Sequence, residues 1–315
     1  MENPTSEEKT LAALAHASVI FGFFGPIGPT LIWVYQRNKS KYVRFHALQA
    51  MGYQALTFWA WLIGIFVVIF GGILITALLS GFLMESTSSD SLFFPFILQP
   101  IIILGIFGLW GLFFIVGIIG AIFCMINRDF KYPLIGHWLK EKLLGDQITE
   151  AEMEEWEDNW VSGVCHATVI LRLLGIITPL IIWFSQKERS AKIRFQAMQA
   201  VIYQLIAVVA YMVGMAAYMV FFFIMIAGTA VFGAVTPSAS TNGDLPPVVG
   251  IIFLIFFGII MIFWLLFMIA TPIYYILAAV ASIFTARGKN FKYPILGEII
   301  SKRLNAPKEE VISAS

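Results

Sequence analysis

The chain has 315 residues, of which 59% are hydrophobic and only 12% are charged, and its mean hydropathy is +0.86. The core of a soluble protein could not absorb so much apolar surface, so the composition predicts an integral membrane protein in contact with the lipid bilayer. The formal net charge of +1 gives no reason to expect a nucleic-acid partner.

Four stretches of the chain contain no Asp, Glu, Lys or Arg. They cover residues 45–84, 91–127, 195–243 and 245–286. Each is far longer than the roughly 20 apolar residues that a membrane-spanning helix needs. The predicted fold class is therefore all-α, a polytopic transmembrane helical bundle.

The chain contains an internal duplication. A shift of 150 residues aligns 16–54 with 166–204 without a gap, and a shift of 161 aligns the Phe-Lys-Tyr-Pro motifs that begin at Phe130 and Phe291. Such a long match indicates two tandem copies of one module. The predicted units are a first membrane module at 1–145, an acidic cytoplasmic linker at 146–160 and a second membrane module at 161–315.

Each module is predicted to contain four elements in the same order. A broken first segment (11–36 and 161–186) precedes a long helix (47–84 and 197–235), a third helix (100–126 and 248–284) and a short amphipathic helix. In the linker, Thr149 and Glu152 have the spacing of a capping box, which predicts a surface helix leading into the second module.

The placement of basic residues decides between two topologies. If the broken segments turn back as re-entrant hairpins, all twenty Lys and Arg except Arg172 lie on one face, and the opposite loops at 85–91 and 236–247 carry none. If the segments cross, the basic loops fall on opposite sides, against the positive-inside rule. We favour four spans and two hairpins in an inner (plasma) membrane, with termini and basic loops cytoplasmic. Arg172, at the hairpin turn, is expected to pair, to line a wet cavity or to snorkel.

Polar side chains recur at helical spacing at the start of each long helix. They are Arg44, His46, Gln49, Tyr53 and Gln54, and in the second copy Arg194, Gln196, Gln199, Tyr203 and Gln204. A polar stripe on an apolar helix must face protein or water. It is either interhelical hydrogen-bond packing or the lining of a polar pathway.

The remaining reactive side chains predict no catalytic or metal centre. His16 and His166 are expected to bond to neighbouring helices, and His46 is replaced by Gln196 in the second copy. Cys124 and Cys165 lie at non-equivalent positions of the repeat, so we predict neither a disulfide nor a metal site, and no cofactor. The predicted spans hold no carboxylate and the chain has no hydrolase or nucleotide-binding motif, which predicts a protein that is not an enzyme.

The short helix after each Phe-Lys-Tyr-Pro motif is amphipathic. We predict that these helices lie at the lipid headgroups, with interfacial anchors at Lys131, Tyr132, Trp138, Lys292 and Tyr293.

The motifs at 43–54 and 193–204, the broken first segment and the Phe-Lys-Tyr-Pro motif together resemble the Tic-twenty-like family of prokaryotic membrane proteins. The resemblance covers nearly the whole chain, twice. It implies a helical membrane fold and a relationship to a membrane subunit of the chloroplast protein translocon.

From the sequence we expect a scaffold or accessory subunit of a larger membrane complex, with other membrane proteins as partners. The alternative is a channel or protein-translocation component with a polar pathway between the modules. Binding of a lipid or quinone between the modules is a third possibility, and the sequence identifies no small-molecule substrate.

Overall fold

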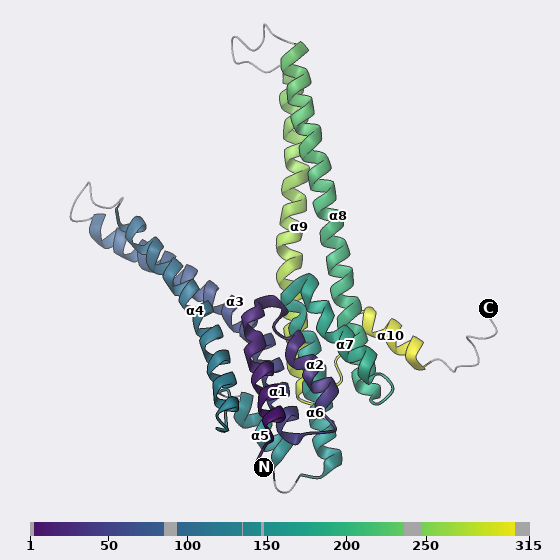
Figure 1. Ribbon diagram of the computed structural model, residues 1–315. Coiled ribbons are helices and arrows are strands. Elements are labelled where there is room, and N and C mark those ends of the chain that lie inside the picture. Colours follow the sequence, from purple (N-terminus) through teal and green to yellow (C-terminus); the bar gives the residue numbers. More distant parts are fainter. Residues whose placement is uncertain (1–2, 85–92, 134, 146–147, 236–246, 306–315) are drawn as a thin grey trace, which may run out of the picture.

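The computed structural model describes residues 3–84, 93–133, 135–145, 148–235 and 247–305 (Figure 1). Every regular element within these ranges is a helix, which confirms the all-α fold class. The predicted loop 85–91 and residues 236–246 of the second loop lie outside the described ranges.

The two modules contain the same elements in the same order. The first consists of α1 (Ser6–Ala17), η1 (Ser18–Phe24), α2 (Ile27–Gln36), α3 (Lys41–Met84), α4 (Phe93–Met125) and α5 (Ile135–Leu144). The second consists of α6 (Glu150–Ala167), η3 (Thr168–Ile176), α7 (Ile177–Gln186), α8 (Ala191–Val235), α9 (Pro247–Ala286) and α10 (Leu296–Asn305). The long helices α3 and α8 begin six residues earlier than predicted, so the whole polar stripe lies on helix.

The long helix α3 packs on α4, and α8 lies beside α9 with ring contacts such as Tyr218 on Trp264. Both pairs project from one end of a smaller base (Figure 1). We call the base the part formed by α1, α2, α5, α6, α7, α10 and the adjoining ends of the long helices. At 1.5 Å per residue, the 44 residues of α3 span about 66 Å, roughly twice a hydrocarbon core of about 30 Å. Half of α3 therefore packs in the base, and the other half exposes apolar side chains such as Phe66 and Phe70.

Among the described residues, five helical stretches are long and apolar enough to cross a membrane. Four of them lie in α3, α4, α8 and α9. The fifth, Glu150–Gln186, is not one straight helix, because the chain turns back within it. This is the second of the two predicted hairpins.

Both broken segments reverse at a single residue with positive φ. Gly22 has φ 57° and ψ −116°, and its counterpart Arg172 has φ 55° and ψ −126°. In the second hairpin Arg189, just after α7, forms an ion pair with Asp158 in the first half of α6, so the end of the hairpin meets its beginning. In the first, Ser40 lies close enough to Glu8 for its hydrogen bond to lower the pKa of that carboxyl.

The linker is not a separate surface segment. The capping box at Thr149 and Glu152 is confirmed, but the helix that it starts continues without a break into the second module. Its later residues are buried against α3: Trp160 lies over Gly52, where a larger residue would collide with the indole, and donates to the carbonyl of Leu48 at 3.0 Å. One apolar core therefore spans both modules.

The terminal helix α5 packs on α3 and α6 within the base and does not lie free at the lipid headgroups. Leu139 and Leu143 are buried, and Trp138 contacts the rings of Trp156 and Trp160 with centroids 5.9 and 5.2 Å apart. The amphipathic pattern was correct, but its apolar face is covered by protein.

Candidate functional site: a buried polar layer in the base

A layer of polar side chains lies buried in the base, and each module contributes one half. In the first half, the Gln49 side chain pairs with the Phe-Lys-Tyr-Pro segment in both directions. Its amide donates to the Phe130 carbonyl at 3.0 Å, and its carbonyl accepts the Tyr132 backbone N–H at 3.2 Å. The Tyr132 hydroxyl reaches His16 Nδ1 at 2.9 Å.

The second half repeats this arrangement. Gln199 donates to the Phe291 carbonyl at 3.0 Å and accepts the Tyr293 N–H at 2.8 Å. The Tyr293 hydroxyl lies 3.1 Å from His166 Nδ1, and the other ring nitrogen of His166 contacts Gln196 Oε1 at 3.0 Å. The two tyrosines also stack on the tyrosines of the long helices, Tyr53 and Tyr203, with centroids 3.8 Å apart in both modules.

The outer members of the stripe bond to neighbouring helices. Tyr53 and Tyr203 donate to backbone carbonyls of α4 and α9 at 3.0 and 2.9 Å. Gln54 donates to the Ala15 carbonyl and to the Ser18 hydroxyl. Within the described residues the amide of its counterpart Gln204 is buried without a hydrogen-bond partner. Most of the stripe thus holds helices together, as the packing interpretation predicts.

Two predicted interfacial anchors lie elsewhere. Tyr132 is 0% exposed and Tyr293 is 1% exposed, and each hydroxyl forms a hydrogen bond with a buried histidine. Lys292 is exposed, and Lys131 pairs with Asp129 at 2.9 Å. Partial burial would raise the pKa of Asp129, but the hydrogen bond and charge of Lys131 outweigh it and lower that pKa.

Arg172 pairs with α9. Its Nε donates to the Tyr275 hydroxyl at 3.0 Å, and its guanidinium lies 6.0 Å from the centre of the Tyr211 ring. This satisfies the pairing alternative, although the side chain remains exposed.

The two modules are joined by a buried ionic cluster that the sequence did not reveal. Glu157 of α6 is 0% exposed and accepts hydrogen bonds from Trp33, Arg37 and Arg44 of the first module. Arg37 also donates to Gln186 of α7 at 2.6 Å. We call Glu157, Arg37, Arg44, Trp33 and Gln186 the Glu157 cluster. Its members come from both modules.

The counterpart of Glu157 in the first copy, Glu7, is exposed at the surface. Within the described residues, the buried Nε of Arg194, the counterpart of Arg44, has no hydrogen-bond partner. The duplication is therefore symmetric in fold but not in charge.

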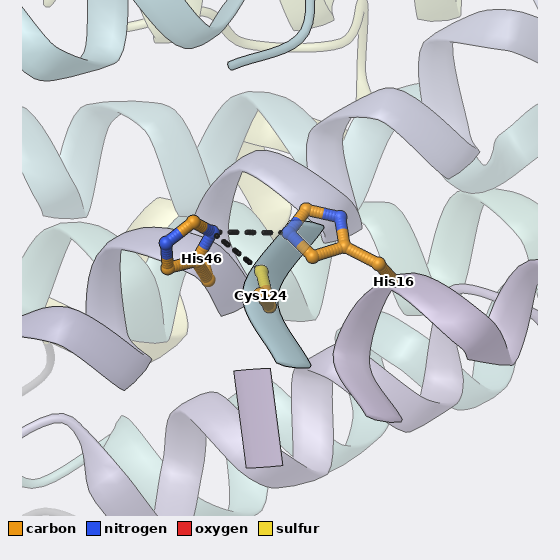
Figure 2. A group of neighbouring side chains, drawn as sticks. All are labelled: His16, His46 and Cys124. Carbon is orange, nitrogen blue, oxygen red and sulfur yellow. Dashed lines mark hydrogen bonds between the residues drawn. The ribbon is translucent and has the colours of Figure 1, made fainter. Parts of the chain in front are cut away.

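The sequence predicts no metal site, yet the structure brings three side chains that can bind a metal close together. His16, His46 and Cys124 converge from α1, α3 and α4, as Figure 2 shows, and their ligand atoms all lie within 4.8 Å of one another. All three side chains are fully buried. The residues are separated by 30 and 78 positions along the chain, so no local motif marks them.

Comparison with known proteins gives one family. The sequence model of the magnetosome magnetite crystal formation protein family matches the chain twice, over residues 7–139 and 157–300. No curated protein and no solved structure matches the chain. The resemblance to the Tic-twenty-like family was wrong: the motifs that suggested it lie inside the two matches, which cover nearly each whole module.

Proposed function

We propose that this chain, which belongs to the magnetosome magnetite crystal formation protein family, is a non-enzymatic accessory protein of the membrane in which magnetite crystals form. In this role it is a framework: two membrane modules held as one body, with lipid-facing helices on which other membrane proteins assemble. The observation that carries the proposal is the Glu157 cluster, which fixes the modules to each other below the long helices.

The hydrogen bonds of the polar layer favour a framework over a channel. The amides of Gln49 and Gln199 are already bonded at both ends to backbone of their own modules. A buried amide that left these partners for a permeating solute would leave backbone groups unpaired, at a cost of about 1–3 kcal/mol each. Such a layer stabilises the base and has little capacity left to line a pathway.

We further propose that the base faces the cytoplasm. The loops after α2 and α7 carry Lys and Arg and lie at the base, and cytoplasmic loops hold the excess of these residues. Asn38 and Glu188 are exposed, equivalent positions of these loops. Asn38→Cys and Glu188→Cys should both react with a membrane-impermeant maleimide only after the membrane is opened. The wild type is the control, since Cys124 and Cys165 are buried. Labelling of either variant in intact vesicles of cytoplasm-inside orientation would contradict this topology.

The framework role is tested in cells that make magnetite. A strain lacking the gene should form crystals of altered size or number by electron microscopy, and the wild-type gene should restore them. Gentle solubilisation of native membranes should recover partner proteins in fixed ratio by mass spectrometry. Unchanged crystals in the deletion strain would refute the crystal-forming role, and a partner-free monomer from native membranes would refute the framework.

A further inference from the structure

The His16, His46 and Cys124 group has the spacing of a metal-binding site. His16 Nε2 lies 3.1 Å from His46 Nδ1, and Cys124 Sγ lies 3.5 Å from the same nitrogen (Figure 2). In a tetrahedral zinc site with bonds of about 2.05 Å to nitrogen and 2.3 Å to sulfur, neighbouring ligand atoms are about 3.4 Å apart for two nitrogens and about 3.6 Å for nitrogen and sulfur. These two separations are within a few tenths of an ångström of the tetrahedral values, and the ligand atoms of all three residues lie within 4.8 Å of one another.

Hydrogen bonding alone satisfies this group poorly. Three groups lie within hydrogen-bond distance of His46 Nδ1, because the Gln49 amide also lies 3.1 Å from it, and this nitrogen can act only as one donor or one acceptor. On the opposite edge of the ring, the buried Nε2 of His46 has no partner within the described residues. A cation at the centre would replace these hydrogen bonds with bonds to the two ring nitrogens and the sulfur, while Gln49 keeps its bond to the Phe130 carbonyl.

The surroundings orient one of the two histidines, His16, as metal sites require. A ligating histidine normally bonds through its second ring nitrogen to a neighbour, which fixes the ring. His16 does this through Nδ1 and the Tyr132 hydroxyl at 2.9 Å. Asp129, which follows α4 and pairs with Lys131 and Lys140, is a carboxylate whose charge acts on both His46 and Cys124.

The second module keeps the fold and the histidine–tyrosine hydrogen bond, but it lacks the other two candidate ligands and the aspartate. In place of His46, Cys124 and Asp129 it has Gln196, Thr285 and Asn290. There the single histidine, His166, bonds to Tyr293 and to Gln196, and the Thr285 hydroxyl bonds to backbone carbonyls of its own helix. The buried pocket thus differs between the copies at the positions that would bind a metal.

We propose that the first module binds one transition-metal ion through His16 Nε2, His46 Nδ1 and Cys124 Sγ, and that the second module binds none. Two imidazoles and a thiolate suit Zn²⁺ or Fe²⁺ and do not suit Mg²⁺ or Mn²⁺, which prefer oxygen. The thiol loses its proton on binding, so the affinity falls as the pH falls. The proposal goes beyond the framework role, which needs no metal.

The test uses the full chain, purified in detergent without a histidine tag. Metal content is measured after expression with added zinc or, under anaerobic conditions, added iron. Titration of the metal-free protein with Co²⁺ then reports the ligands, because a tetrahedral thiolate site gives visible cobalt bands and an ultraviolet sulfur-to-cobalt band. We expect one equivalent of zinc or iron per chain and both cobalt signals, and the metal that predominates identifies the resident ion.

Variants taken from the second module separate binding from folding. His46→Gln and Cys124→Thr install residues that the homologous pocket already accommodates, so both proteins should fold and lose stoichiometric binding. Cys165→Ser, at the buried cysteine outside the group, should keep both cobalt signals. A wild type without stoichiometric metal or cobalt signals, an unchanged titration of His46→Gln, or loss of the signals in Cys165→Ser would each overturn the proposal. Because these readouts do not involve crystal formation, they can fail while the framework role stands.

Discussion

Replacement of Glu157 by Gln should destabilise the protein strongly. The carboxylate is fully buried and accepts hydrogen bonds from Trp33, Arg37 and Arg44. An amide of the same shape cannot neutralise either guanidinium, and removing one partner of a buried ion pair costs about 3–5 kcal/mol. Burial already lowers the pKa of Arg37, opposed by the negative charge of Glu157, so this cation depends on its partner.

The effect can be measured as thermal unfolding in detergent, followed by tryptophan fluorescence, because Trp33 belongs to the cluster. With about 2–4 °C per kcal/mol for a chain of this size class, the midpoint should fall by about 6–20 °C. Glu7→Gln is the matched control, since it makes the same chemical change at the equivalent, exposed position of the first copy and should leave the midpoint unchanged. If Glu157→Gln unfolds at the same temperature as Glu7→Gln, the cluster does not hold the modules together.

Two further substitutions probe the hairpin turn and the polar layer. In a denaturation assay, Gly22→Ala should lower the free energy of unfolding by about 1–3 kcal/mol. The positive φ of Gly22 is the only cause, since a Cβ there meets no other atom. The control is Gly71→Ala, in open space on regular helix, which should be neutral or stabilising in the same assay. Gln199→Leu leaves the Tyr293 N–H unpaired, whereas the Phe291 carbonyl keeps a hydrogen bond from Gln196, so the substitution should cost about 1–3 kcal/mol in that assay. Equal stabilities of the two glycine variants would refute the backbone argument, and a fully stable Gln199→Leu protein would refute the role of the amide.

The sequence by itself determined the class of fold and its repetition. Charge-free stretches identify α3, α4, α8 and α9, because the length and polarity that a membrane requires are local properties of the chain. The paired glycines and prolines indicated that the first segment of each module is broken. The sequence placed Arg172 at the turn of the second hairpin, but it could not show that this residue adopts a positive φ, which is uncommon for arginine.

The tertiary structure decided where each polar side chain lies. Glu157 belongs to a stretch whose acidic composition is typical of a solvated helix, yet packing of α6 on α3 buries it between two arginines. Tyr132 has the sequence environment of an interfacial anchor, and the fold turns it inward to His16.

The same reason explains the potential metal site. His46 and Cys124 are 78 residues apart. In the sequence, His46 is a single polar side chain and Cys124 a single thiol on otherwise apolar helices, so neither indicates a metal site. Only the packing of α1 and α4 against α3 brings them to His16 (Figure 2). Helices and repeats follow from neighbours along the chain, whereas sites of this kind depend on which helix faces meet.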